Sequence, residues 1–573
     1  MGKILKIQKY LHKQCLSLYM IRKNPLFLAL CLNLFFLFLY FAFGQVRHGS
    51  LDDYFMSSVL TGAYGGEYDV HTYFVNSAYG YFLKPFYWLF PKVGWYFIFE
   101  LAGTFAAFTT FSFFIIRRLG IKYGTVISSV LLASLTPDFY FQLSFTQCAT
   151  IYTAAGIVSL LFGISESRKK FLLLGGFFLF AGNVMRYEGF LLGMPFLCFL
   201  LAVHFFEKRR ISLIAVIVIC VTFASIWGIR EHDRTLYSSG DYKYYAAYQP
   251  IRAFFGDGAY YDGEATYDEL EERGMSGPDF KNLQAWMYYD TDVYQIDSLK
   301  PIRKIAQNNL YVPNPKRVVV TYFFSISNAL MRCSGWCWVL VCVLLMLSSS
   351  KKANVYPWIS FGFVAICIGY LLLLNRLVFH VESGIWVYAI TSAIPFMRKE
   401  ILTNNELFMK KEKKYLLGMI LLSVVFTYIG ISNQGVLKQH LSIIETPEMT
   451  DDWAEFLDYA GNHLDDVFLL SFDRYKELGT VKNPAYKAIE PGSWQNIFSW
   501  GYWNIHLPGM KYEFEKRGVY NPIRDVVHKN VYVLEDEFGP VLAPFYLEHY
   551  HDTVVVDTVK TFGKMVLHKY RLK

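Results

Sequence analysis

The stretch Leu51-Asp52-Asp53-Tyr54-Phe55 places two carboxylates directly after the first long apolar segment of the chain, Leu26 to Phe43. Ionised groups beside hydrocarbon are costly, so acids at a membrane boundary tend to be kept for function. Neighbouring helical residues point about 100° apart, and we expect only one of the two acids to face a substrate. The alternative is that the pair caps a helix beginning at Tyr54.

The composition around this stretch indicates a polytopic membrane protein. Of the 573 residues, 54% are hydrophobic, 18% are aromatic and 18% are charged. At about 1.5 Å per residue, Leu26 to Phe43 is just long enough for a hydrocarbon core of roughly 30 Å. A long basic leader precedes it without a clear small-residue cleavage site, which predicts a retained helix.

Hydropathy predicts about eleven membrane-spanning helices, with the N-terminus inside and the C-terminus outside. Lysines and arginines concentrate in the short loops that this topology places in the cytoplasm, so the net charge of +8 mostly reports topology. No soluble segment has the basic face that nucleic-acid binding requires. The expected spans are 26–43, 94–116, 121–140, 144–165, 171–185, 189–206, 211–229, 331–349, 354–375, 378–397 and 413–432.

Three outer segments are too long to be simple connectors. We expect a transmembrane domain, 1–432, that includes outer loops 45–93 and 230–332, and an extracytoplasmic soluble α/β domain, 433–573. In the first loop, Ala78 to Phe90 is aromatic enough to lie as a helix in the membrane interface. In the tail, periodicity predicts helices over 451–463 and 513–517 and strands over 466–471, 531–534, 553–559 and 564–569.

Cysteines and glycosylation signals bear on the compartment. All nine cysteines lie in or beside predicted spans or the leader, which argues against a disulfide framework outside the membrane. Cys333 and Cys337 lack partner histidines, so packing is favoured over metal binding. The chain has no Asn-x-Ser/Thr acceptor. This favours a bacterial cell membrane over the membrane of the endoplasmic reticulum.

The order of these features resembles the C-type membrane glycosyltransferase superfamily (GT-C). The likeness covers most of the chain: an inside N-terminus, an acidic pair after the first helix, interfacial helices, a second long outer loop after seven spans, and an outer soluble tail. The resemblance implies transfer of a sugar from a polyprenyl-phosphate carrier to a glycan, lipid or protein acceptor on the outer face, and we expect this transfer to be inverting. It also implies that Asp52 or Asp53 is the general base for the acceptor hydroxyl.

The carrier phosphate of such a donor needs a cation near the membrane interface. Arginines suit this role because the guanidinium forms bidentate hydrogen bonds, whereas a boundary cation can also simply extend to lipid headgroups. An internal ion pair of Arg186 with Glu188 or Glu100 is a further alternative. The candidates, with their polar neighbours, are Arg186 with Glu188, Arg376 with His380, and Lys84.

A second acidic cluster, Glu67 and Asp69, lies on the first outer loop. Its carboxylates could supply a second catalytic group or hold a divalent cation, Mg²⁺ or Mn²⁺, although a solvated turn is favoured because Gly65-Gly66 precedes them. The second outer loop is rich in tyrosine, as in Tyr244-Tyr245-Ala246-Ala247-Tyr248. Such rings suit either sugar stacking or the membrane interface.

Two other functions have the same topology class. A transporter or flippase of lipid-linked sugars is disfavoured because transporters usually have similar halves, and this chain is lopsided. A polymerase or ligase of envelope glycans is harder to separate. A lipid-monophosphate sugar donor would favour the transferase, and a lipid-diphosphate glycan would favour the ligase.

Overall fold

The computed structural model describes residues 24–44, 47–208, 211–256, 261–310, 315–346, 351–374, 377–399, 410–432, 447–478, 485–536 and 542–573. The chain divides into two compact units, each built from three separate stretches. The first unit comprises Met1–Ser50, Phe97–Gly228 and Pro315–Leu437. The second comprises Leu51–Tyr96, Ile229–Asn314 and Lys438–Lys573. The predicted division into a transmembrane domain, 1–432, and a soluble domain, 433–573, stays a prediction.

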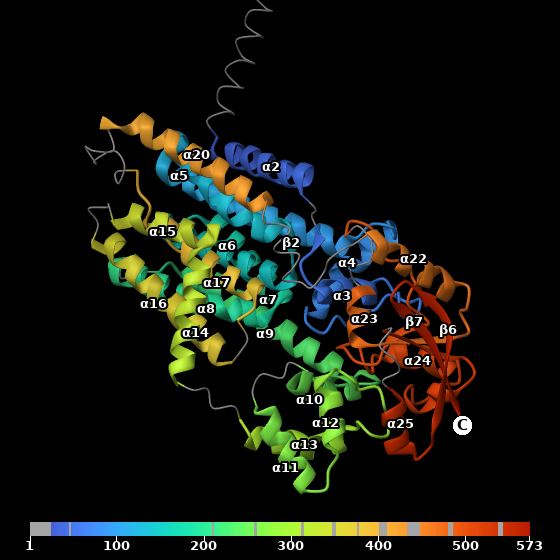
Figure 1. Cartoon of the computed structure of the whole chain (residues 1–573). Coiled ribbons are helices and arrows are strands. Elements are labelled where there is room, and N and C mark those ends of the chain that lie inside the picture. Colours follow the sequence, from blue (N-terminus) through green and yellow to red (C-terminus); the bar gives the residue numbers. More distant parts are fainter. Residues whose placement is uncertain are drawn as a thin grey trace, which may run out of the picture. The chain divides into compact units, whose positions relative to one another are not determined.

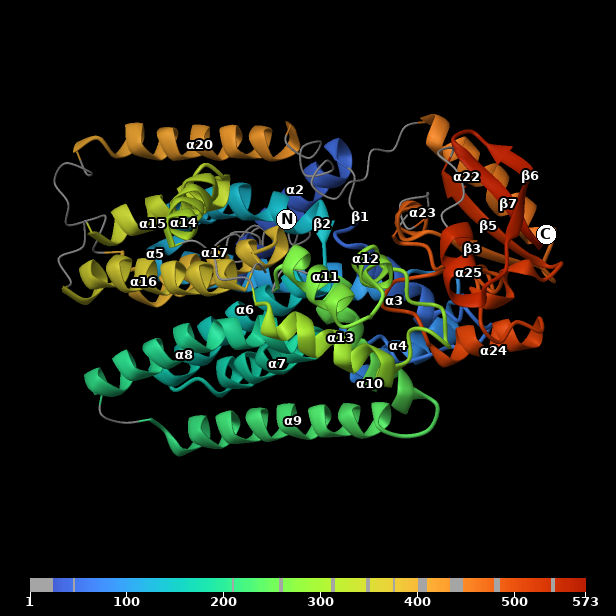
Figure 2. The same cartoon turned by 60° about the horizontal axis from the view of Figure 1, so that its bottom comes forward.

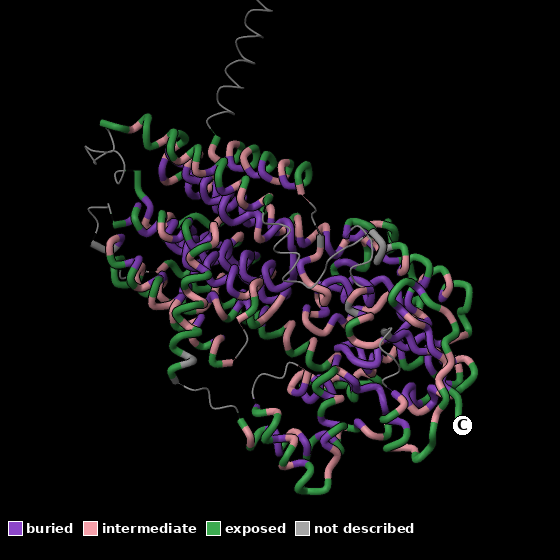
Figure 3. The backbone as a smooth tube through the Cα atoms, in the orientation of Figure 1, coloured by how far each residue is buried: buried purple, intermediate pink, exposed green. Residues whose placement is uncertain are grey.

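The first unit is a bundle of helices around α6 (Phe145–Ser165) (Figures 1 and 2). This helix is buried along almost its whole length, as Figure 3 shows, because it packs against α7 (Lys169–Met185), α8 (Tyr187–Lys208) and α17 (Phe379–Thr391). Glycines allow the closest approach, since a Cβ atom on Gly163 would lie 2.6 Å from the backbone nitrogen of Leu172. The remaining long helices are α2 (Pro25–Phe43), α5 (Trp95–Tyr140), α9 (Leu213–Tyr237), α14 (Pro315–Leu330), α15 (Cys333–Met346), α16 (Lys351–Leu373) and α20 (Glu412–Ser432).

Seven of the described helices are long and apolar enough to cross a membrane, and the bent pair α14 and α15 would add an eighth. Several present most of their apolar surface outward. Only 17% of the apolar stretch of α20 is buried inside the protein, as expected for a helix that faces lipid. The prediction of a helical multi-pass membrane protein is therefore confirmed. The count of about eleven spans and the orientation stay predictions.

Two predicted features of these helices have clear local causes. The 46 residues of α5 form two helices that meet at a kink, because Gly120 adopts a non-helical conformation with φ +79°, and this kink separates the predicted spans 94–116 and 121–140. The predicted hairpin around Arg186 is confirmed, because α7 ends at Met185 and α8 begins at Tyr187. A short parallel pair, β1 (Arg47–His48) with β2 (Gln142–Leu143), joins the end of the first helix to this unit.

The second unit contains a five-stranded sheet in the order β4-β3-β5-β7-β6. Strands β4 (Ile497–Ser499), β3 (Val467–Leu470) and β5 (Val531–Asp536) are parallel, whereas β7 (Met565–Leu572) pairs antiparallel with β5 and with β6 (Val554–Phe562). The continuous apolar run of β3 is buried on both faces, as in parallel sheets covered by helices. The predicted strands are confirmed within a few residues. β4 was missed because three residues carry no periodic signal.

Short helices surround this sheet and continue into the two outer loops of the same unit. The predicted interfacial helix is present as α4 (Ser77–Leu89), and its large exposed side chains include Tyr81, Phe82 and Trp88. An exposed aromatic face fits a membrane interface. The other helices are α3 (Leu51–Leu60), α10 (Tyr242–Gly256), α11 (Gly263–Glu272), α12 (Gly277–Gln284), α13 (Ile296–Asn308), α22 (Pro447–Gly461), α23 (Phe472–Leu478), α24 (Pro508–Lys516) and α25 (Leu542–Tyr550).

The second outer loop is fastened to the tail through backbone atoms. The N–H groups of Tyr288 and Tyr289 both donate to the carbonyl oxygen of Trp500, at 2.8 and 3.0 Å. A Cβ atom on Gly501 would lie 1.2 Å from the carbonyl oxygen of Trp286. Glycine is therefore required at position 501, because any side chain would separate the two segments.

We expect Gly501→Ala to destabilise the second unit by at least about 3 kcal/mol, since the added methyl group meets backbone that cannot move aside. Thermal unfolding and limited proteolysis of the purified chain would measure the loss. The matched control is Gly461→Ala, where a Cβ atom meets nothing within 4 Å. Equal melting of both variants would contradict the tight docking of these segments.

Candidate functional site

The acidic pair lies in the first turn of α3, which begins at Leu51. The interpretation of the pair as an N-cap of a helix beginning at Tyr54 is therefore wrong. Two acids in the first turn still stabilise the helix, because their negative charges interact favourably with the helix dipole. Asp53 is 0% exposed and accepts a hydrogen bond from the hydroxyl of Tyr96 at 2.9 Å. Asp52 is partly exposed and accepts one from Tyr502 at 2.7 Å.

Asp52 thus has an aromatic hydroxyl from the tail as its partner within the second unit. Burial, and then the neighbouring carboxylate of Asp52, raises the pKa of Tyr502 well above its usual range, so the phenol stays protonated and donates. Phe55 lies against this phenol, with ring centroids 5.2 Å apart. Asp52 is thus a partly exposed residue whose carboxylate is oriented by a buried phenol.

The second acidic cluster is divided by the fold. Glu67 is exposed, whereas Asp69 binds residues of its own unit. The Oδ1 atom of Asp69 accepts from the backbone N–H of His71 at 3.0 Å and lies 2.6 Å from its Nδ1 atom. Its Oδ2 atom accepts from the hydroxyl of Tyr242. Asp69 therefore joins the two outer loops through side chains, and Glu67 stands apart from this contact.

Lys84 lies exposed on α4, with its Nζ atom 5.9 Å from the ring centroid of Tyr68. The same helix exposes Tyr81 and Phe82. A lysine beside exposed aromatic rings has the position of a side chain that reaches lipid headgroups.

In the first unit, Arg186 and His380 come together although they are far apart in the chain. The Nη1 atom of Arg186 donates to the hydroxyl of Thr146 at 2.6 Å, and its guanidinium lies 5.0 Å from the ring centroid of Phe145. His380, on α17, lies within electrostatic reach of this guanidinium. The Arg186 side chain is 26% exposed, so an anion can approach it.

Glu188 lies 3.6 Å from Nε of Arg186, the contact expected for the alternative ion pair, but its own side chain is 73% exposed. An ion pair with so much solvent contact is weak and leaves Arg186 available. Arg376 lies outside the described residues. Glu100 is fully buried, and Tyr152 donates to its backbone carbonyl at 2.9 Å.

The tyrosines of the second outer loop are mostly core residues. Tyr245, Tyr248 and Tyr288 are fully buried, so they do not form open stacking platforms for sugars.

Three residues next to these rings or to the acids were missed in the sequence. Tyr96 and Tyr502 carry no local signal because each acts on an acid from a distant segment. Arg252 was missed because the sequence does not show which of the two cations of α10 is buried. Arg252 is buried, whereas Lys243, on the same helix, is exposed.

Among the described residues, one group has the ligand types and distances of a metal centre. The ligand atoms of Asp279, Glu548 and His549 all lie within 4.8 Å of one another. The Nε2 atom of His549 lies 2.6 Å from a carboxylate oxygen of Asp279, and Ser276 donates to Glu548 at 2.6 Å. The three side chains therefore have partners without a cation.

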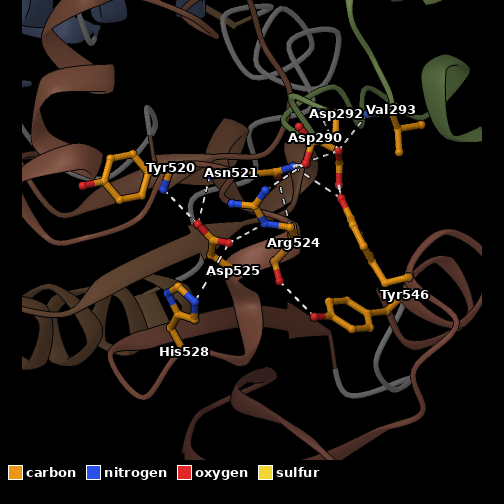
Figure 4. A network of polar contacts seen from close by, with 10 residues as sticks. Asp290, Asp292, Val293, Tyr520, Asn521, Arg524, Asp525, His528 and Tyr546 are labelled. Atoms are coloured by element: carbon orange, nitrogen blue, oxygen red, sulfur yellow. Dashed lines mark hydrogen bonds and ion pairs between the residues drawn. The ribbon is translucent and has the colours of Figure 1, made fainter.

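A polar network near this group ties the second outer loop to the tail (Figure 4). Asp290 is fully buried and accepts bonds from Asn521 at 3.0 Å and from the hydroxyl of Tyr550 at 2.5 Å. Asn521 also donates to Asp292 at 2.9 Å, and Arg524 pairs with Asp292 at 3.0 Å. The network is saturated, which marks it as structural rather than catalytic.

Comparison with known proteins adds little. No family model matches the chain, and no curated protein matches it significantly. Among solved structures, the chain is similar to ArnT from Cupriavidus metallidurans in the apo state, with 12% identity, coverage of 94% of this chain and 97% of that chain, and a TM-score of 0.38. That score is too low to support an inference. The fold itself defines a helical multi-pass membrane protein with a second, α/β-containing unit.

We expect the stability of the second unit to depend on the protonation of His549. Burial alone would lower the pKa of His549, but the hydrogen bond and charge of Asp279 outweigh it and raise the pKa above its usual value. A raised pKa stabilises the folded state fully below about pH 6.5, and this gain is lost as the pH rises through the folded-state value. His549→Gln should flatten that decline.

The measurement is the thermal midpoint of the whole chain against pH, with a chelator present so that metal binding does not contribute. His232→Gln is the matched control, because His232 is exposed and has no carboxylate partner among the described residues. A natural chain whose midpoint rises above pH 6.5, or a variant with the same decline, would contradict the assignment.

Proposed function

We propose that this protein is an inverting membrane glycosyltransferase of the GT-C type. It moves a sugar from a polyprenyl-phosphate donor to a glycan, lipid or protein acceptor at the outer face of a bacterial cell membrane. The observation that carries the proposal is the pair of carboxylates at the start of α3, one sealed and one accessible. The apolar helices of the first unit offer a lipid-like surface for the carrier.

In the proposed reaction, Asp52 is the general base, and Asp53 holds α3 in place through its hydrogen bond with Tyr96. The carboxylate of Asp52 accepts the proton of the acceptor hydroxyl as that oxygen attacks the anomeric carbon. The bond from that carbon to the phosphate oxygen breaks, and the polyprenyl phosphate leaves with the electron pair. Tyr502 donates to Asp52 and so helps to orient its carboxylate, while Asp53 is enclosed and accepts a hydrogen bond from Tyr96.

For the carrier phosphate, we propose Arg186 with His380 nearby. Among the described candidates, Arg186 is favoured because its side chain is partly exposed and is oriented by Thr146. Charge-assisted hydrogen bonds of a guanidinium to a phosphate are strong and directional. Lys84 is proposed to contact headgroups instead. Dependence on Mg²⁺ or Mn²⁺ stays a prediction, which transfer in the presence of a chelator would test.

The transporter and the glycan polymerase or ligase remain the alternatives. A transporter has no need of an oriented base, so the enclosed and accessible carboxylates favour transfer. Use of a lipid-monophosphate sugar in preference to a lipid-diphosphate glycan would separate the transferase from the ligase.

We expect Asp52→Asn to lower sugar transfer by about 10²-fold or more at unchanged folding, because the general base is lost. Asp53→Asn should instead lower thermal stability by about 1–3 kcal/mol, since it disturbs a buried hydrogen bond, with a smaller loss of transfer per folded molecule. Transfer from a radiolabelled polyprenyl-phosphate sugar pool in membranes, at matched expression, measures both. Normal transfer by Asp52→Asn would exclude it as the base.

Arg186→Gln should raise the donor KM by about 10- to 100-fold, as expected for the loss of a charge-assisted bond of about 1.5–3 kcal/mol. Steady-state transfer at varied donor concentration measures it. Arg168→Gln, a change of the same charge at an exposed arginine before α7, is the control. If both variants keep the KM of the natural chain, another residue holds the phosphate.

A further inference from the structure

Arg252 is a buried arginine without an acidic partner among the described residues. It lies on α10 in the second unit and is 3% exposed. Its Nε atom donates to the side-chain oxygen of Gln249 at 2.8 Å, and its guanidinium lies 5.0 Å from the ring centroid of Trp286. The Nη1 atom is enclosed and has no hydrogen-bond acceptor in the part of the chain that the structure describes.

This arrangement is costly. An arginine guanidinium is charged at any physiological pH and offers five N–H donors. In the part of the chain that the structure describes, the Arg252 side chain donates one hydrogen bond and forms no ion pair. The ring of Trp286 compensates only part of the lost hydration. A bound anion would supply the acceptors that this buried charge lacks.

Two further donors near Arg252 also lack acceptors. The hydroxyl of Tyr245 and the Nε1 atom of Trp503 are enclosed and have no partner among the described residues. Tyr245 lies within electrostatic reach of Arg252. Trp503 is joined to it through Gln249, whose amide donates to the Trp503 carbonyl at 2.7 Å. An oxygen-rich anion would satisfy donors of this kind.

The backbone around these donors is strained. Trp286 and His506 adopt left-handed conformations, with φ of +62° and +61°. Such values are unfavourable for bulky residues and tend to occur at binding sites. His506 packs against Tyr248, with ring centroids 4.4 Å apart, and Tyr248 lies within electrostatic reach of Arg252. The surrounding fold therefore holds the aromatic rings around Arg252, those of Trp286 and Tyr248, in fixed positions.

The same cluster reaches the proposed base. Tyr502 donates to Asp52 at 2.7 Å, and its ring lies 6.3 Å from that of Trp286, the residue that stacks on Arg252. Arg252 is also within electrostatic reach of the Tyr502 hydroxyl. Asp52 and Arg252 thus flank one phenol within a single unit.

We propose that Arg252 is the centre of an anion site that takes a phosphate group of a substrate beside Asp52. The phosphate belongs either to the acceptor or to the lipid carrier, in which case Arg252 takes the role proposed above for Arg186; both phosphates have the same chemistry at the guanidinium. Arg252 supplies charge-assisted hydrogen bonds from its terminal nitrogens, and Tyr245 and Trp503 are the neighbouring donors. The link to transfer rests on the proposed function, whereas the binding of phosphate does not.

The test is direct binding by the purified full chain, with undecaprenyl phosphate as the probe for the carrier and glucose 6-phosphate as a probe without a lipid. The variants are Arg252→Gln, Arg252→Lys and Arg186→Gln. Arg273→Gln is the matched control, because it removes the same charge from an exposed arginine paired with Glu269. Thermal midpoints are recorded for every variant without a probe.

We expect Arg252→Gln to weaken one probe by at least about tenfold, with Arg252→Lys intermediate and Arg273→Gln unchanged. If Arg252→Gln loses binding of undecaprenyl phosphate and Arg186→Gln keeps it, the carrier phosphate is assigned to Arg252. Loss of glucose 6-phosphate alone assigns a phosphate of the acceptor. The thermal midpoint of Arg252→Gln should equal or exceed that of the natural chain, because an unpaired buried charge is removed.

The proposal is overturned if the natural chain binds neither probe, if Arg252→Gln binds both as tightly as the natural chain, or if both Arg252 variants melt much lower than Arg273→Gln. The last result would make Arg252 a structural residue held by Trp286 and Gln249. Asp52→Asn separates the two proposals, since it should lose transfer and keep binding. If Asp52→Asn transfers normally while Arg252→Gln loses a probe, the anion site stands and the proposed base does not.

Discussion

Burying a charged group requires a partner, and in this protein the partners come from distant parts of the chain. Tyr96 donates to the enclosed Asp53, and Asn521 and Tyr550 donate to the enclosed Asp290. Breaking such a bond would leave a desolvated carboxylate, so each bond fixes one segment against another. The second unit, built from three separate stretches, is therefore held by its acids as well as by its aromatic core.

Arg252 departs from this pattern within the same unit, and the departure is informative. The acids nearby are either saturated by hydroxyl and amide donors or partly open to solvent, yet this arginine keeps an enclosed nitrogen without an acceptor among the described residues. Asp53 and Asp290 accept hydrogen bonds from protein donors, whereas the Nη1 atom of Arg252 has no acceptor among the described residues. Strained and unsatisfied groups tend to persist where a ligand completes them.

Local sequence signals predicted the elements well wherever they were long or sharply interrupted. The apolar runs gave the long helices, the turn at Arg186 gave the break between α7 and α8, and the tail strands were found within a few residues. The three-residue β4 and the start of α3 at Leu51 were missed, because short elements and helix ends depend on packing and on neighbouring strands. The predicted cation Arg376 and the number of spans stay predictions.

The sequence by itself determined that this is a multi-pass helical membrane protein with an acidic pair after its first span, because hydrophobic length and charge position are local properties. Only the tertiary structure decided that Asp53 is sealed by Tyr96 while Asp52 stays accessible beside Tyr502. It likewise decided that Arg252 lies buried without an acidic partner among the described residues. The physical reason is that burial and pairing depend on residues from other segments, 43 positions away for Asp53 and 450 for Asp52, which no local pattern records.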